Sequence, residues 1–156
     1  MPISIESIDD YVSRYWDEHI VPSLVEYIKI PALSVDFDPD WAASGFLDQA
    51  KDLAVRWIRQ HAPAEWTLHD QSLPGRTPLL LIEVPGQSNE TFLLYGHLDK
   101  QPEMEGWWDG FGPWTPIIKD QKLYGRGGAD DGYALFASIA ALKALAEQGL
   151  PHPRIV

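Results

Sequence analysis

The sequence predicts an α/β fold in which helices cover both faces of a sheet, a three-layer arrangement that is incomplete in this chain. Two continuous apolar runs support this prediction, at residues 79–84 and 91–95, with Pro85 and Gly86 between them. Unbroken apolar strands are usually buried on both faces, as in sheets that lie between helices. Residues 133–148 are rich in alanine and leucine and predict one of the covering helices.

The first thirty residues predict two helical pieces. Ser7 and Asp10 resemble a capping box, and apolar residues recur at helical spacing from residue 8 to about residue 19. Pro22 cannot continue a helix but is favourable in a first turn. Residues 21–28 are therefore predicted to form a second helix or a kinked extension of the first.

The next helix is predicted at residues 41–61, where apolar residues again follow one face. Asp38 or Asp40 is the expected N-cap, because a short carboxylate can accept hydrogen bonds from the first free amides of a helix. The period then changes, and alternating residues 65–69 predict a strand.

The second half of the chain predicts a short hairpin and a further strand. Residues 114–119 and 122–124 are separated by Asp120 and Gln121, which favours a tight turn between two strands. Residues 154–156 are predicted to begin another strand. No internal repeat and no linker divides the chain, so one folded unit is expected.

Composition excludes several classes of protein. Lys and Arg number 12 against 23 Asp and Glu, and the formal net charge of −11 argues against nucleic-acid binding. The chain has no cysteine, so any metal would be held by histidine and carboxylate side chains. The first residues lack the basic and apolar segments of a secretory signal, and no apolar run is long enough to span a membrane. We expect a soluble cytoplasmic protein with no membrane partner.

The first motif with chemical potential is GHLDKQP at residues 96–102, directly after the predicted strand 91–95. In an extended backbone His97 and Asp99 project to the same side, so the carboxylate can orient the imidazole while the other ring nitrogen binds a metal. A histidine that is simply capped by a neighbouring carboxylate fits the same pattern.

The second motif is GRGGADDG at residues 125–132, a glycine-rich turn between a predicted strand and a predicted helix. Its spacing resembles a dinucleotide fingerprint, but Asp130 stands where the third glycine is required and would repel a pyrophosphate. The helix N-terminus favours the ionised forms of Asp130 and Asp131, and ionised carboxylates are good ligands for divalent cations. A pair of plain N-cap residues is the alternative.

Together the two motifs resemble the M20 metallopeptidase family, in particular its carnosinase-like dipeptidase and aminoacylase group. Asp130 follows His97 by 33 positions, and the intervening EGWWDGFGPWTPIIKDQKLYGRG is also similar to the family. The resemblance covers about residues 5–156 and is specific from 94 to 134. It implies the fold of the zinc exopeptidases, which is phosphorylase/hydrolase-like, and two zinc ions in the complete enzyme.

The resemblance also implies roles for individual residues. His97 would ligate one zinc ion, Asp130 would bridge both, and Asp99 would be the catalytic-site residue that holds the His97 ring. A cis peptide bond is expected between Asp130 and Asp131. After this pair the family commonly has Lys-Gly, whereas this chain has Gly132 and Tyr133. No residue is expected to bind another cofactor.

The implied activity is metal-dependent hydrolysis of peptide or amide bonds in small substrates, with dipeptides favoured. We expect residues 1–156 to form the N-terminal part of the catalytic domain, with the general base, further ligands and a lid or dimerisation domain outside it. The chain alone is therefore expected to be inactive. Two alternatives remain: deacylation of N-acyl amino acids, and a non-catalytic truncated domain that binds metal or another protein. Homo-oligomerisation is left open.

Aromatic residues follow the first motif closely and allow two interpretations. They could line a substrate pocket, or they could form the core at the root of a loop, which is the commoner role of such residues. The residues concerned are Trp107, Trp108, Phe111 and Trp114.

Overall fold

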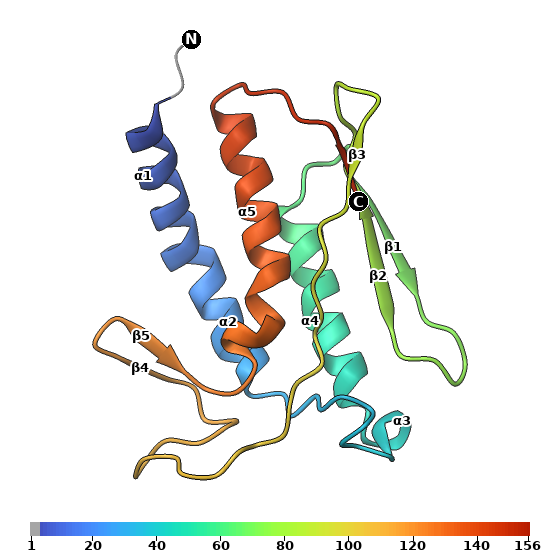
Figure 1. Ribbon diagram of the computed structural model, residues 1–156, viewed down its shortest axis with the longest axis vertical. Helices are drawn as coiled ribbons and strands as arrows, with labels where there is room; N and C mark the ends of the chain where they lie inside the picture. The colour runs from blue at the N-terminus through green and yellow to red at the C-terminus, as the bar shows by residue number, and fades with distance from the viewer. Residues whose placement is uncertain (1–3) are drawn as a thin grey trace.

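The structure is a computed structural model that describes residues 4–156 (Figure 1). The chain begins with helix α1, Ile5–Tyr15, which passes through a wider π-helical turn, Trp16–Ile20, into helix α2, Val21–Ile28. The amide of Val21 bonds to the carbonyl of Trp16 in that turn. The first two predicted helical pieces are therefore a continuous extension, with Pro22 in the first turn of α2.

The predicted capping box at Ser7 and Asp10 is wrong. Ser4 is the N-cap of α1, and its hydroxyl accepts a hydrogen bond from the amide of Ser7 at 3.2 Å. The helix thus starts one turn earlier than predicted, because Ser4 offers the same capping chemistry as Ser7 and Ile5 already belongs to the helix.

The predicted helix at residues 41–61 is interrupted. It consists of α3, Trp41–Ser44, and α4, Phe46–His61, separated by Gly45, whose φ of +68° ends the first piece. Asp40 occupies the N-cap position of α3 without a side-chain hydrogen bond. Asp38 instead accepts hydrogen bonds from the Asp40 amide and the Ser44 hydroxyl, so neither aspartate caps the helix as expected.

Two pairs of strands, joined by one bridge, form an incomplete sheet, and a separate hairpin lies outside it. Strand β1, Thr67–Gln71, pairs antiparallel with β2, Leu79–Glu83, with Leu68 opposite Ile82. Strand β3, Thr91–Phe92, pairs parallel with β6, Arg154–Ile155. Two hydrogen bonds between Val84 and Ile155 place β6 between β2 and β3.

Two predicted strands have different bounds in the structure. The strand expected at 65–69 lies at 67–71, where the antiparallel partner β2 sets the register. The strand expected at 91–95 ends at Phe92. Beyond it the chain stays extended, and its last sheet-like hydrogen bond runs from the Leu94 amide to the Val156 carbonyl.

The hairpin and the last helix form where the sequence predicts them, although the first strand of the hairpin begins at Ile117 rather than at residue 114. Strands β4, Ile117–Lys119, and β5, Lys122–Tyr124, are joined by Asp120 and Gln121, both in the left-handed region with φ of 50° and 59°. Two consecutive left-handed residues are typical of the type I′ turn that matches strand twist. Helix α5 spans Tyr133–Glu147.

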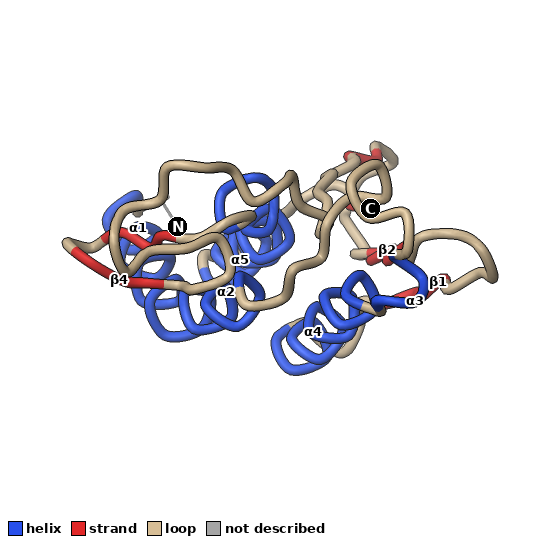
Figure 2. The backbone as a smooth tube through the Cα atoms, turned by 90° about the horizontal axis from the view of Figure 1, so that it is seen from below, coloured by secondary structure: helices blue, strands red, loops and turns tan. Residues whose placement is uncertain are grey.

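The core lies among the helices and one face of the sheet. Tyr27 and Ile28 of α2, Ile58 of α4 and Phe136 of α5 are all buried. Figure 2 shows α1, α2 and α5 grouped together, with α4 beside β1 and β2. These findings confirm the α/β class with an incomplete sheet. None of the helices within residues 4–156 is long and apolar enough to cross a membrane.

Strand β2 is not buried on both faces as its apolar run suggested. Leu80 and Ile82 pack against the helical core, whereas Leu79 and Leu81 point the other way and are 53% and 39% exposed. The alternation follows from the period of two in a strand, which separates successive side chains onto opposite faces. An apolar surface therefore remains on the outer face of β2.

Candidate metal centre

His97 lies in the extended segment after β3, and its ring is held by Asp99. The Nδ1 atom is 3.0 Å from the backbone carbonyl oxygen of Asp99 and 3.2 Å from its carboxylate Oδ1. Both of these atoms are acceptors, so the ring proton belongs on Nδ1. This leaves a lone pair on Nε2, the form in which a neutral imidazole binds a metal.

Asp130 reaches the same place from a different part of the chain. It lies in the turn Gly128–Gly132 that leads into α5, where Asp130 and Asp131 have non-helical backbone angles. The peptide bond between these two residues is cis, as the family resemblance implied. The Oδ1 atom of Asp130 lies 3.6 Å from Nε2 of His97. The structure therefore brings together the two predicted ligands.

The separation of these two atoms fits two ligands of one zinc ion. A tetrahedral zinc with bonds of about 2.0–2.1 Å to nitrogen and oxygen places its ligand atoms about 3.4 Å apart. The observed distance of 3.6 Å is slightly larger than this and too long for a hydrogen bond. Asp130 is 60% exposed at its side chain, so an ion could enter from solvent.

The two predicted ligands do not make a complete metal site. Within residues 4–156, no group of three or more histidine and acidic side chains is arranged to hold an ion. Asp131 directs its Oδ2 towards the backbone of Gly96. Glu103 accepts a hydrogen bond from the indole nitrogen of Trp114 at 2.9 Å.

Tyr27, at the end of α2, supports both motif segments and was not predicted from the sequence. Its hydroxyl donates to the carbonyl of Leu98 at 2.8 Å, and its ring fills the space where a Cβ at Gly132 would lie. Burial raises the pKa of Tyr27, and Asp99, Asp131 and Asp130 add to this shift. The tyrosine therefore stays neutral and can donate its hydrogen bond beside three carboxylates.

Lys100 is the second supporting residue that the sequence did not reveal. It is 1% exposed, and its ammonium group donates to the carbonyls of Tyr27, Ile28 and Ile30 at 2.8, 3.3 and 2.6 Å. Burial lowers the pKa of Lys100 to about 7. A lysine in an extended polar segment gives no sequence signal of burial, because such residues are usually exposed.

Three of the four aromatic residues after the first motif, Trp107, Trp108 and Phe111, line a surface hollow. Trp108, Phe111 and Tyr124 pack edge to face or tilted, with ring centroids 5.1–6.3 Å apart, and Trp108 is 68% exposed. The hollow has a volume of about 260 Å³ and includes Met104 and Trp107. The interpretation of these aromatics as core is therefore not supported, and a role in substrate binding stays a prediction.

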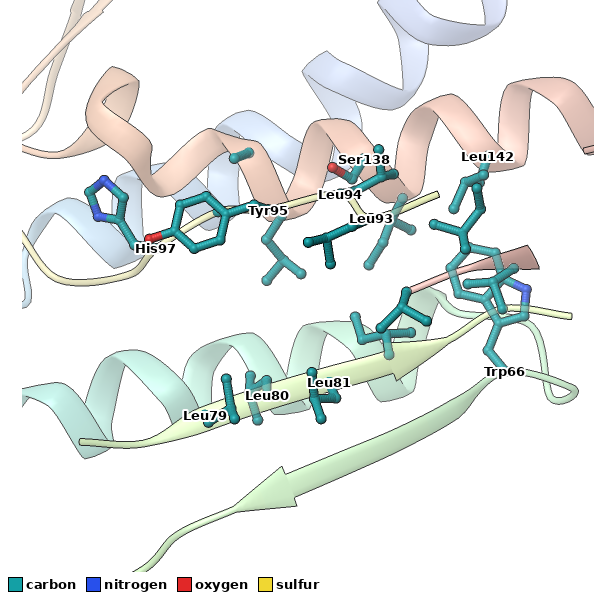
Figure 3. Close-up of a pocket in the computed structure, with 18 of the residues that line it drawn as sticks. Trp66, Leu79, Leu80, Leu81, Leu93, Leu94, Tyr95, His97, Ser138 and Leu142 are labelled. Carbon is teal, nitrogen blue, oxygen red and sulfur yellow. The ribbon is translucent and has the colours of Figure 1, made fainter. Parts of the chain in front are cut away.

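A second hollow begins beside His97 and runs along the outer edge of β2 (Figure 3). Its volume is about 220 Å³, and it is lined mainly by apolar side chains of β2, of residues 93–98 and of α5. Figure 3 shows Leu79 and Leu81 on one side and Tyr95 on the other, with His97 at one end. This hollow offers no further metal ligand, because His97 is the only histidine or acidic residue in its lining.

Comparison with known proteins agrees with this geometry. Residues 93–156, which contain both motifs, match the family described as Peptidase family M20/M25/M40. The Beta-Ala-His dipeptidase of Homo sapiens is 32% identical over 96% of this chain and 31% of its own length. The Cys-Gly metallodipeptidase dug1 of Schizosaccharomyces pombe is 27% identical over 98% of this chain and 33% of its own length.

Solved structures give the same result. The dipeptidase Dug1p of Saccharomyces cerevisiae matches the fold with a TM-score of 0.71 at 24% identity, over 97% of this chain and 33% of that one. Human carnosine dipeptidase 1 matches with a TM-score of 0.64 at 27% identity, over 99% of this chain and 34% of that one. The fold is similar to that of these dipeptidases, and both motifs lie in the part of the chain that matches the family. The chain belongs to peptidase family M20, and it spans about a third of the length of these relatives.

Proposed function

We propose that this chain supplies part of the metal centre of a metal-dependent hydrolase that cleaves peptide bonds in small substrates. The observation that carries the proposal is the 3.6 Å approach of His97 Nε2 to Asp130 Oδ1, with Nδ1 of the same ring engaged by Asp99. His97 and Asp130 act as metal ligands. Asp99 keeps the ring proton on Nδ1 and so directs the Nε2 lone pair towards the ion.

The metal we propose is zinc, with two ions in the complete enzyme, and Asp130 would be a ligand to both. Nitrogen and carboxylate oxygen ligands without thiolates suit this ion, and the chain has no cysteine. Bound zinc polarises a carbonyl group and makes a water molecule more acidic. The further ligands and the general base are proposed to come from residues outside this chain, which would be the N-terminal part of the catalytic domain.

Dipeptides are the proposed substrates, because the relatives are named for the dipeptides Beta-Ala-His and Cys-Gly. Deacylation of N-acyl amino acids would use the same centre and remains the alternative reaction. The expected cytoplasmic location and homo-oligomerisation stay predictions.

The test compares two lengths of the protein with zinc and the dipeptide β-alanyl-histidine. We expect a longer protein read from the same coding frame to release histidine, and to lose this activity with a chelator or with His97→Ala. The 156-residue chain alone should release none, because two ligands hold zinc weakly. Hydrolysis that survives both the chelator and the substitution would overturn the proposal, and so would zinc-dependent hydrolysis by the short chain that does not need His97.

A further inference from the structure

Lys100 is a buried lysine without a carboxylate partner. None of the ion pairs found within residues 4–156 includes it, although its side chain is almost fully enclosed. Burying an unpaired charge costs free energy, and an apolar side chain of similar shape would fill the same space at lower cost. The position of Lys100 is therefore better explained by what its contacts hold in place than by stability alone.

The ammonium group of Lys100 meets the negative end of helix α2. Two of its acceptors, the carbonyls of Tyr27 and Ile28, belong to the last turn of that helix, and the third, Ile30, follows it directly. The carbonyl of Tyr27 also accepts from the amide of Ile30, and that of Ile30 from the amide of Ala32, so Lys100 adds to these bonds. A positive charge at this place also interacts favourably with the helix dipole. The ammonium also lies 4.1 Å from the centre of the Tyr27 ring.

The backbone and stem of Lys100 connect this helix end to both motif segments. Its amide donates to Ala32 and its carbonyl accepts from Ser34, which fixes the first motif against the segment after α2. Its aliphatic stem packs against Gly127, where an added Cβ would lie 2.7–2.8 Å from three stem carbons. Gly127 also has a φ of +83°, so this position requires glycine on both grounds.

The same helix end holds the turn that carries Asp130. Ile28 packs closely against Gly125 and Gly128, and Tyr27 packs against Gly132. The end of α2 is thus the common support for the turn 128–132 and, through Lys100, for the segment that carries His97. Lys100 is also the only lysine that is buried among residues 4–156.

We propose that Lys100 is a positioning residue that sets the distance between His97 and Asp130 by holding both motif segments to the end of α2. The effect of Lys100 on metal binding rests on the proposed function. Its effect on the positions of the two motif segments does not depend on metal. Lys100 touches neither proposed ligand, so its effect on metal binding is indirect.

The chain offers a matched control in Lys143. This lysine donates to the carbonyl of His61, the last residue of α4, at 2.8 Å, and its ammonium lies 5.4 Å from the Tyr15 ring. Lys143→Met therefore removes a lysine that caps a helix end beside a tyrosine, as Lys100→Met does, but it lies within α5, 11 positions after the second motif ends. Both substitutions should alter stability, and only Lys100→Met should alter the metal site.

The experiment measures Zn²⁺ affinity and backbone amide shifts of the 156-residue chain by NMR, with the wild type and both variants folded. Lys100→Met should weaken Zn²⁺ binding by about tenfold, as loss of an outer-shell residue commonly does. Without metal it should shift the amides of residues 97–99 and 128–132 together. Lys143→Met should leave the Zn²⁺ affinity and those amides unchanged.

The outcomes separate this inference from the proposed function. Wild-type affinity in folded Lys100→Met, or metal-free amides that stay in place at residues 128–132, would overturn the positioning role. If the wild type itself binds no Zn²⁺ through His97, the proposed function fails, while coupled amide shifts in Lys100→Met still support the role in positioning. Should Lys100→Met not fold, Lys100→Gln, which retains two N–H donors, takes its place in the same comparison.

Discussion

The ring of Tyr27 lies directly against Gly132, at the end of the turn that carries Asp130. This contact joins the last turn of α2 to the first turn of α5. A side chain at residue 132 would clash with the tyrosine ring. The hydroxyl of the same tyrosine donates to Leu98, between His97 and Asp99. One side chain therefore contacts both segments of the candidate metal centre.

Gly132→Ala is expected to destabilise the protein by about 1–3 kcal/mol, the usual cost of forcing extra volume into a packed site. The reason is steric, because the backbone of Gly132 is helical and would otherwise accept alanine. Urea unfolding of the variant measures the loss. Tyr27→Leu combined with Gly132→Ala should recover part of it, whereas additive losses in the double variant would show that the ring is not the cause.

The exposed leucines of β2 are expected to make the 156-residue chain bind the dye ANS and associate at high concentration. Replacing Leu79 and Leu81 with threonine should reduce both effects with little change in the thermal midpoint, because both side chains already face solvent. The same exchange at Leu80 and Ile82 is the control, and it should cost about 1–3 kcal/mol through lost burial. Equal losses of stability from the two faces would contradict the register found for β2.

His61 is expected to make stability fall as the solution becomes acidic. Burial lowers the pKa of His61 below its ordinary value of 6.5, and His19 and Lys143 lower it further. As pH falls below 6.5, His61 takes up a proton in the unfolded chain more readily than in the folded chain. The free energy of unfolding therefore decreases as pH falls through 6.5. The free energy of unfolding of wild type and His61→Gln, measured from about pH 7.5 to 5.5, should diverge in slope. Parallel slopes would show that His61 does not contribute.

The sequence predicted the meeting of His97 and Asp130, but not the residues that hold them together. The two motifs could be found because each combines a ligand type with a recognisable local backbone, an extended segment or a glycine-rich turn. Tyr27 and Lys100 act through contacts 71–73 positions apart in the chain. Nothing in their local sequence distinguishes such residues from an ordinary helix-end tyrosine and an exposed lysine.

Helix and strand bounds were less predictable than element types, for reasons visible at particular residues. Ser4 and Ser7 offer the same capping chemistry, and the local sequence does not reveal which of them caps α1. Gly45 divides the predicted helix at 41–61 because it adopts the left-handed backbone that glycine tolerates. The run 91–95 has the composition of a strand, but sheet pairing extends only to Phe92. Strand assignment depends on a partner, which composition does not reveal.

The most direct test of the metal centre is a Zn²⁺ titration of the 156-residue chain with ¹⁵N-labelled histidine. Zinc should shift the Nε2 signal of His97, and Asp130→Asn should weaken this binding by about tenfold, whereas Asp120→Asn, in the hairpin turn, should not. A His97 signal that does not respond to zinc, or a response that is unchanged by Asp130→Asn, would contradict the pairing of these two residues as metal ligands.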